Sequence, residues 1–246
     1  MPELTPRPTP PTVRRIGHKG ADHIAPGNTL ASFDAALAHG CDMVEFDVLP
    51  ENPDGSGALV LAHDFKDAGR RTPLTLEQGL DHLSSPAFAG VELDVDLKTH
   101  GYEERVVAAL RERGMEARTL ISTMEVVSLP VLRAASRDIR LGWSVPKVKR
   151  NYLAHPATRP LALATVALLR RTVPRAVTRA MRAGEIDAVM SHFSLVTPHF
   201  VRAVARAGGE LYVWTVDDAD RIRRFERMGV TGVITNDPRL FDPLPA

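Results

Sequence analysis

Short apolar runs rich in β-branched residues alternate along the chain with segments of helical periodicity. We predict eight strands from the apolar runs. They cover Val13–Gly17, Met43–Leu49, Val91–Leu97, Thr119–Ser122, Ile139–Trp143, Ala188–Ser191, Leu211–Val216 and Gly232–Thr235. The helical patterns between them cover Thr29–His39, Tyr102–Arg113, Met124–Ala135, Pro198–Ala207 and Asp218–Met228. Strands and helices that alternate in this way are typical of a parallel sheet.

The number of strand and helix repeats favours an α/β fold of the (β/α)8 TIM-barrel type. An open doubly wound sheet fits less well, because the chain contains no GxGxxG or Walker motif. An extra strand over Ala58–Ala62 follows the second predicted strand after a turn-rich stretch, and it predicts a small insertion there. We expect a flexible, proline-rich arm over residues 1–12 and a single domain over residues 13–246.

One stretch, which begins with the fifth predicted strand and ends before the sixth, differs in charge from the rest of the chain. Residues 139–184 contain ten Lys or Arg and no Asp or Glu. The part over Leu161–Met181 has apolar and basic faces and predicts an interrupted, basic helical insertion. Two interpretations stay open: a solvated helix that covers the barrel, or a surface over residues 147–182 that lies against an anionic membrane.

Composition limits the classes of partner and of compartment. The chain has 246 residues and a net charge of +1, so we expect no nucleic-acid partner. A single cysteine, Cys41, rules out an internal disulfide. The longest strongly apolar run, Leu161–Leu169, is shorter than the roughly 20 residues that span a bilayer. We therefore predict a cytoplasmic protein that is at most peripheral to a membrane.

Candidate chemistry lies at the ends of the predicted strands, where TIM barrels carry their active sites. His18 and Lys19 follow the first strand, and this pair can transfer a proton and hold a phosphate. Glu45 and Asp47 leave the second strand on the same face, because side chains alternate along a strand. Two neighbouring carboxylates in a barrel need compensation, either from a divalent cation or from an Arg or Lys across the barrel.

The third strand and the insertion repeat this chemistry. Asp96 and Lys98 lie on one face near the end of the third strand, and Glu92 and Asp94 lie lower, where we expect them to pair with Lys or Arg. His63 ends an apolar strand and offers a second proton-transfer group beside His18. Together these residues predict metal-assisted phosphoryl or acyl hydrolysis, with phosphate favoured by the cations.

The order of these motifs resembles the glycerophosphodiester phosphodiesterase family. The resemblance runs from about Arg14 to Leu240 and leaves out the basic stretch. The motifs that carry it are Gly17-His18-Lys19-Gly20, Pro26-Gly27-Asn28-Thr29-Leu30, Glu45-Phe46-Asp47-Val48, His63-Asp64, Asp96-Leu97-Lys98, Val213-Trp214-Thr215-Val216 and Gly232-Val233-Ile234-Thr235-Asn236. Three positions depart from the family's usual residues: Lys19 replaces Arg, Gly27 replaces Glu, and Asp96 replaces Glu.

The resemblance implies a TIM barrel that hydrolyses glycerophosphodiesters to glycerol 3-phosphate and an alcohol. It implies acid and base roles for His18 and His63 and a divalent metal, Mg²⁺ or Ca²⁺, on Glu45, Asp47 and Asp96. The substrate contacts that it implies are Lys19, Lys98, Asn28 and Trp214. Two alternatives stay open: a lysophospholipase D that acts on lipid-derived phosphodiesters at a membrane surface, and a barrel that binds a phosphorylated ligand without catalysis.

Overall fold

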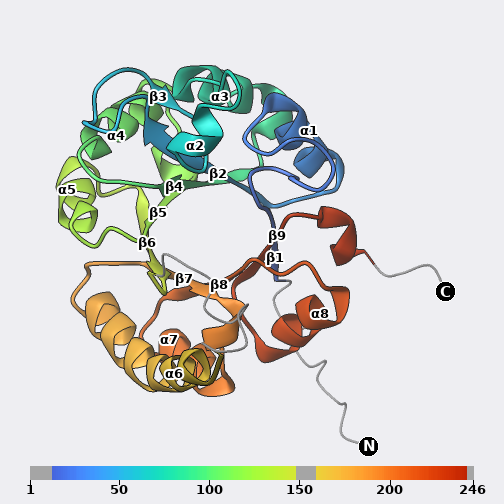
Figure 1. The fold of residues 1–246 in the computed structure, drawn as a ribbon, viewed down its shortest axis with the longest axis vertical. Helices are drawn as coiled ribbons and strands as arrows, with labels where there is room; N and C mark the ends of the chain where they lie inside the picture. The colour runs from blue at the N-terminus through green and yellow to red at the C-terminus, as the bar shows by residue number, and fades with distance from the viewer. Residues whose placement is uncertain (1–12, 148–158, 243–246) are drawn as a thin grey trace, which may run out of the picture.

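A computed structural model describes residues 13–147 and 159–242, and it has eight parallel strands that close into a barrel (Figure 1). The predicted TIM-barrel fold is confirmed. The arm predicted over residues 1–12 lies outside the described residues. The barrel strands are β1 (Arg14–Gly17), β2 (Met43–Pro50), β4 (Glu92–Leu97), β5 (Thr119–Thr123), β6 (Arg140–Val145), β7 (Ala188–His192), β8 (Glu210–Trp214) and β9 (Gly232–Thr235).

Helices surround the barrel and bury their apolar faces against the outside of the strands (Figure 1). The predicted helices form, each within a few residues of its expected bounds, whereas α2 and α3 were not predicted. Gly229 ends α8 in the left-handed conformation, as the glycine after the predicted helix indicates. The helices are α1 (Leu30–Ala38), α2 (Phe65–Ala68), α3 (Leu76–Leu83), α4 (Glu103–Glu112), α5 (Ser128–Ala135), α6 (Arg159–Arg182), α7 (Pro198–Arg206) and α8 (Ala219–Met228).

The predicted insertion after β2 contains a strand, but a shorter one than the sequence suggests. Strand β3 (Leu59–Val60) pairs antiparallel with the end of β2, with Val60 opposite Leu49. This pairing brings the chain back over the carboxyl end of β2. Because His63 lies three residues after β3, the insertion carries this histidine to the end of the barrel where Asp47 and Asp96 lie.

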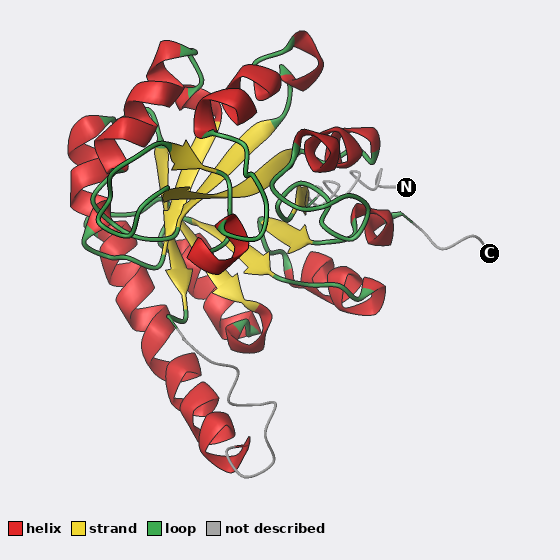
Figure 2. Ribbon diagram, turned by 45° about the horizontal axis from the view of Figure 1, so that its top comes forward, coloured by secondary structure: helices red, strands yellow, loops and turns green. Residues whose placement is uncertain are grey.

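Helix α6 is continuous rather than interrupted, and part of it is a regular element of the barrel. Val177, Ala180 and Met181 are buried, so the second half of α6 covers the barrel between β6 and β7 as the other helices do. Pro174 lies inside the helix without ending it. The first half extends beyond the barrel (Figure 2). Most of the described part of the basic stretch is therefore the helix that follows β6, lengthened at its start. Residues 148–158 of the predicted insertion lie outside the described residues.

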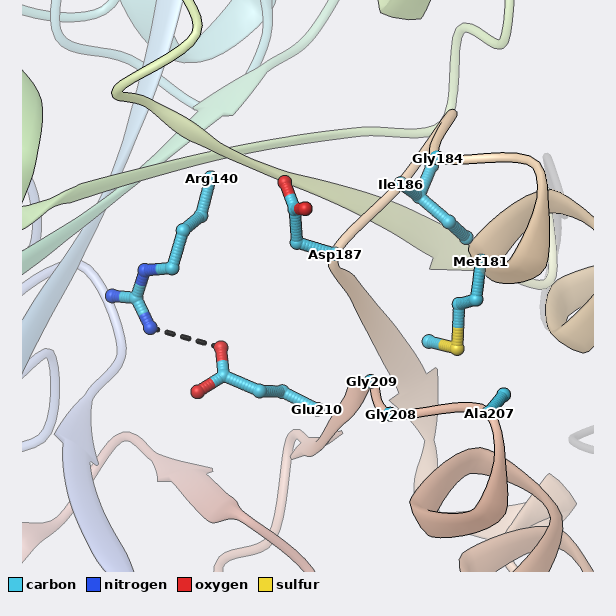
Figure 3. A pocket seen from close by; sticks show the side chains of 9 residues that line it. All are labelled: Arg140, Met181, Gly184, Ile186, Asp187, Ala207, Gly208, Gly209 and Glu210. Carbon is cyan, nitrogen blue, oxygen red and sulfur yellow. Dashed lines mark hydrogen bonds and ion pairs between the residues drawn. The ribbon is translucent and has the colours of Figure 1, made fainter.

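Ion pairs occupy the barrel interior at the amino-terminal ends of the strands. Arg140 contacts Glu92 at 2.5 Å and Glu210 at 2.9 Å, and Arg14 contacts both carboxylates at 3.2 Å. The lower position and the cationic partner expected for Glu92 are confirmed. The cationic partner expected for Asp94 is not found, because no Lys or Arg among the described residues forms an ion pair with it. A surface pocket opens beside this network, and the Arg140 guanidinium in it is turned toward Glu210 (Figure 3).

We predict that Arg140→Ala destabilises the fold. The substitution leaves Glu92 and Glu210 with Arg14 as their shared partner, and we expect a loss of about 1–3 kcal/mol in the free energy of unfolding. Urea denaturation measures this change. Arg239→Ala is the control, because Arg239 is exposed and pairs only locally with Asp237. Equal stability of the Arg140 variant and the wild type would contradict a structural role for the network.

Candidate active site and metal centre

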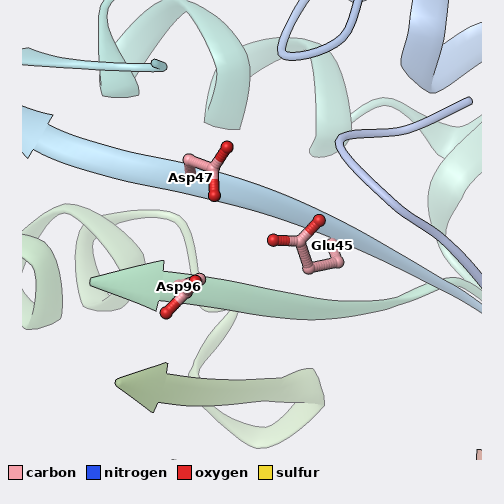
Figure 4. Close-up of side chains that lie close together, drawn as sticks. All are labelled: Glu45, Asp47 and Asp96. Carbon is pink, nitrogen blue, oxygen red and sulfur yellow. The ribbon is translucent and has the colours of Figure 1, made fainter. Parts of the chain in front are cut away.

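Three carboxylates converge inside the barrel near the carboxyl ends of two adjacent strands. Glu45 and Asp47 leave β2 on one face, and Asp96 leaves β4 directly opposite Asp47 in the strand register. Oxygens of all three lie within 4.8 Å of one another (Figure 4). Glu45 and Asp47 are buried, and Asp96 is partly exposed. The alternation in the sequence predicts this convergence, because i and i+2 side chains share a strand face.

Lys98 is the one cation that the two strands place among these carboxylates. Its Nζ lies 2.5 Å from Asp47 Oδ1 and 2.6 Å from Asp96 Oδ2. Burial by itself would raise the pKa of Asp47, but the Lys98 ammonium, with smaller contributions from His63 and His18, holds that pKa well below its usual range. Burial opposes the charge on Lys98, yet Asp47 and Asp96 raise its pKa well above the usual value. Lys98 therefore stays charged.

One ammonium does not balance the negative charge of the cluster. Burial and the neighbouring Asp47 raise the pKa of Glu45 well above its usual value. Asp94 lies opposite Glu45 in the register, is buried, and has a pKa raised to about 8 by burial and by Asp96. Its Oδ1 has no hydrogen-bond partner among the described residues. A further positive charge next to Glu45 and Asp94 would therefore stabilise the ionised forms of these carboxylates.

His18 is held by a tight loop after β1. The backbone turns so sharply that a side chain at Gly17 would collide with the carbonyl oxygen of Gly20, and Lys19 adopts a positive φ of 50°. The Lys19 N–H donates to Glu45 Oε2 at 2.7 Å, which ties the loop to the carboxylate cluster. The His18 Nε2 lies 3.9 Å from the same Glu45 oxygen.

The hydrogen bonds of Asn236 decide which ring nitrogen of His18 carries the proton. The Asn236 Nδ2 donates to Asp217 Oδ2 at 2.6 Å, and its backbone N–H donates to Asp217 Oδ1 at 2.8 Å. Because a carboxylate only accepts, the amide oxygen of Asn236 must face His18, where it lies 2.6 Å from Nδ1. His18 Nδ1 therefore carries the proton, and the Nε2 lone pair faces Glu45.

His18 is also neutral over a wide pH range. Burial lowers its pKa from 6.5 to about 4 against the opposing attraction of Asp47. A neutral imidazole with an unprotonated Nε2 can accept a proton. The sequence motif includes Asn236 but assigns it no role, and Asp217 could not be identified from the sequence. Both residues lie in loops that meet His18 only in the folded chain.

His63 lies at the rim of the site. Its side chain is about half exposed, and its Nδ1 lies 3.4 Å from Asp64 Oδ2. Asp64 caps the short helix α2 by accepting the N–H of Asp67, so the residues next to His63 are held by local hydrogen bonds. The structure thus places His63 where solvent and a substrate can reach it.

Asn28 and Lys19, which the resemblance predicts to contact substrate, instead contact carboxylates of the protein itself. Asn28 is buried, donates to Asp47 Oδ2 at 2.8 Å and accepts the Asp47 N–H at 3.0 Å, so it braces a predicted metal ligand. The Lys19 ammonium lies 3.1 Å from Asp22. Asp22 also accepts the Gly27 N–H at 2.8 Å and fills the space that a side chain at position 27 would need. Asp22 therefore leaves no room for a larger residue at position 27 without a shift of its carboxylate.

Trp214 forms part of an aromatic wall at the carboxyl ends of β7 and β8. Its ring meets the edge of His192 with 5.1 Å between the centroids, and His192 packs on Phe193 at 4.2 Å. The indole Nε1 of Trp214 is buried and has no acceptor among the described residues. His192 accepts the N–H of Ser194, which holds its ring in this wall.

Comparison with known proteins assigns the chain to a family. The sequence profile of the Glycerophosphoryl diester phosphodiesterase family matches residues 18–74 and 94–240. The chain belongs to this family. The second matched segment runs through residues 139–184, so the expectation that the basic stretch falls outside the resemblance was wrong. Members of this family are phosphoric diester hydrolases, and the family supports hydrolysis of glycerophosphodiesters by this chain.

Individual relatives agree with the family assignment. A glycerophosphodiester phosphodiesterase of Caldanaerobacter subterraneus is 23% identical over 91% of this chain and 93% of that protein. Two solved structures share the fold. One, a glycerophosphodiester phosphodiesterase from Parabacteroides distasonis, has a TM-score of 0.70 and 17% identity and covers 93% and 94% of the two chains. The other, an Oleispira antarctica phosphodiesterase in complex with the product sn-glycerol-3-phosphate, has a TM-score of 0.65 and 20% identity over the same shares.

We predict that Asn236→Ala alters the tautomer of His18 in this phosphodiesterase. The wild type should show a protonated Nδ1, and the variant, without the Asn236 acceptor, a mixture of both tautomers. The ¹⁵N chemical shifts of the His18 ring distinguish the two forms. Asn52→Ala, at an exposed position in the insertion, is the control. A wild-type ring protonated at Nε2 would contradict the hydrogen-bond assignment.

We also predict that His18 makes stability depend on pH. In the unfolded chain its imidazole protonates near pH 6.5, but in the fold only near pH 4. Between these values the unfolded state binds more protons, so the free energy of unfolding falls as the pH falls through this window. Urea denaturation in EDTA at about pH 7 and about pH 5 measures this loss. His18→Gln should lose less stability than the wild type, and parallel losses would contradict the shift.

Proposed function

We propose that this family member hydrolyses glycerophosphodiesters to glycerol 3-phosphate and an alcohol by metal-dependent catalysis, with His18 and His63 as base and acid. The observation that carries the proposal is the neutral His18, whose unprotonated Nε2 faces the carboxylate cluster 3.9 Å from Glu45. A base in this position can act on an oxygen nucleophile near the cluster. His63, at the exposed rim, is free to reach a leaving group.

The donor set fits a divalent metal ion. Glu45, Asp47 and Asp96 offer oxygens within 4.8 Å of one another, and hard cations such as Mg²⁺ and Ca²⁺ take oxygen ligands. The raised pKa of Glu45 supports this fit, because a cation would favour the charged carboxylate. When bound, such an ion supplies positive charge that offsets the charge developing on the phosphate oxygens. Mg²⁺ or Ca²⁺ remains our proposal for its identity.

The residues of this chain then divide the proton transfers. His18 accepts the proton of the attacking hydroxyl group, which belongs either to water or to the glycerol moiety. His63 donates a proton to the departing alkoxide, so the bond between phosphorus and the alcohol oxygen breaks without release of a strong base. Lys98 stays protonated between Asp47 and Asp96 and adds positive charge near the phosphate.

Other residues shape the substrate site. Trp214 offers an apolar wall for the alcohol or glycerol moiety, consistent with its half-buried ring beside His192. Lys19 stays a proposed phosphate contact, which requires its ammonium to leave Asp22. Asn28 contributes by fixing Asp47 rather than by contacting substrate.

A second candidate is a lysophospholipase D reaction at a membrane surface, with the same site residues and an acyl-bearing substrate. Helix α6 favours it, because exposed leucines and arginines stand beside the end of the barrel that holds the site. A cytoplasmic protein in peripheral contact with a membrane fits this candidate. Faster turnover of lysophosphatidylcholine than of glycerophosphocholine would favour it over the first. Binding of glycerophosphocholine without turnover would favour a non-catalytic barrel.

We predict that His18→Ala and His63→Ala each lower turnover by at least about a hundredfold while metal binding persists. Glu45→Ala should instead lose metal affinity, and EDTA should abolish wild-type activity. A coupled assay of glycerol 3-phosphate release from glycerophosphocholine, with Mg²⁺ or Ca²⁺ added back, measures turnover, and calorimetry measures metal binding. His39→Ala, at the opposite end of the barrel, is the control. Near-full activity of His18→Ala would show that the base is another group.

A further inference from the structure

Helix α6 is far longer than the barrel requires. It has 24 residues, or about 36 Å at about 1.5 Å per residue, whereas α4 and α8 have 10 residues each. It follows β6, whose carboxyl end lies at the same end of the barrel as the carboxylate cluster, and it precedes the start of β7. Its first half therefore projects past the active-site end of the barrel, and Figure 2 shows this extension.

The projecting half carries an apolar segment over Leu163–Leu169, which we call the apolar tip. Seven residues from Leu163 to Leu169 include one polar side chain, Thr165. Leu163 and Leu168 are 55% and 60% exposed, which places them among the most exposed large apolar side chains in the described structure. They lie on different sides of the helix, because five residues separate them. Val166 and Leu169 are partly buried, so one side of this part of α6 is partly covered, while Leu163 and Leu168 are open to solvent.

Basic residues follow the apolar tip toward the barrel. Arg171, Arg175, Arg179 and Arg182 are spaced so that they share one helix face, and all four are exposed. None has a carboxylate partner among the described residues. Helix α7 packs against α6 and adds Arg202 and Arg206, both exposed. Neither helix contains Asp or Glu.

Arg170 has a different role from the four arginines of this face. Its Nε donates to the carbonyl oxygen of Ser194 at 2.8 Å, just after β7. This bond ties α6 to the rim of the barrel at the point where the helix leaves it.

We propose that the first half of α6 inserts into the surface of an anionic lipid bilayer, with Arg171 and Arg175 at the level of the lipid headgroups. A bilayer combines a negatively charged layer with an apolar interior, and the helix presents arginines beside an exposed apolar tip. A nucleic acid would match the arginines and leave Leu163 and Leu168 in water. Because the tip projects at the active-site end, docking brings the site toward the membrane.

This inference deepens the proposed function, since it places the phosphodiesterase site next to lipid-derived substrates. It does not require a membrane-spanning segment. In the described parts of the chain, no helix has both the length and the apolar character to cross a bilayer. The apolar tip and the arginines instead suit peripheral, reversible binding whose strength depends on anionic lipid and on salt.

Vesicle co-sedimentation of the full chain tests the proposal. We expect the wild type to bind phosphatidylcholine vesicles that contain phosphatidylglycerol and not to bind vesicles of phosphatidylcholine alone. Leu163→Ser/Leu168→Ser and Arg171→Glu/Arg175→Glu should each lower the partition coefficient by about tenfold or more. Arg137→Glu/Arg227→Glu reverses two exposed arginines outside α6 and should bind like the wild type.

The outcomes separate this proposal from its alternatives. Loss of binding in the arginine variant with full binding in the leucine variant would overturn insertion and point to a purely electrostatic partner. Absence of wild-type binding, or an equal loss of binding in the control variant, would refute the proposal that α6 forms a lipid-binding surface. Hydrolysis of soluble glycerophosphocholine, measured in parallel, should be unchanged in the α6 variants. Its absence in the wild type would refute the proposed reaction while leaving vesicle binding as evidence for the surface.

Discussion

The buried negative charge at the carboxyl ends of β2 and β4 is the constraint on which the rest of the site depends. Strand alternation and register bring Glu45, Asp47 and Asp96 together in an interior where ionised groups lose their hydration. Lys98 supplies one positive charge in direct contact with two of them. Burial, together with the remaining negative charge of Asp47, raises the pKa of Glu45 and favours a cation.

The protonation of His18 also depends on this charge, in a way that fits the proposed base role. An imidazole in such a field would ordinarily gain a proton, yet burial keeps His18 neutral against the attraction of Asp47. The Asp217–Asn236 pair then directs the His18 proton to Nδ1, away from Glu45. Burial keeps the ring neutral, and the hydrogen bond to Asn236 selects the nitrogen that carries the proton. Only the two effects together leave Nε2 as an acceptor.

The parts of this arrangement that lie on strands could be predicted from the sequence, because a strand fixes the side-chain direction by period alone. This holds for Glu45, Asp47 and Asp96 and for the ion pair of Glu92. The loop contacts could not be predicted in the same way. The hydrogen bonds that Asn28 makes to Asp47, and the way Asp22 fills the space beside Gly27, depend on segments whose conformation no short-range pattern specifies.

The role of helix α6 could not be predicted from its sequence pattern either. Its composition indicated a basic helix, but an apolar and basic pattern describes a covering helix and an exposed one equally well. What separates the two is the position of Pro174 and of the buried Val177, which mark where the helix enters the barrel wall. Before Pro174, Val173 still packs against the core, whereas Leu163 and Leu168 farther along the projecting half are exposed. Exposure of the apolar tip to water is energetically unfavourable. Insertion into a lipid surface at the active-site end would remove this unfavourable exposure.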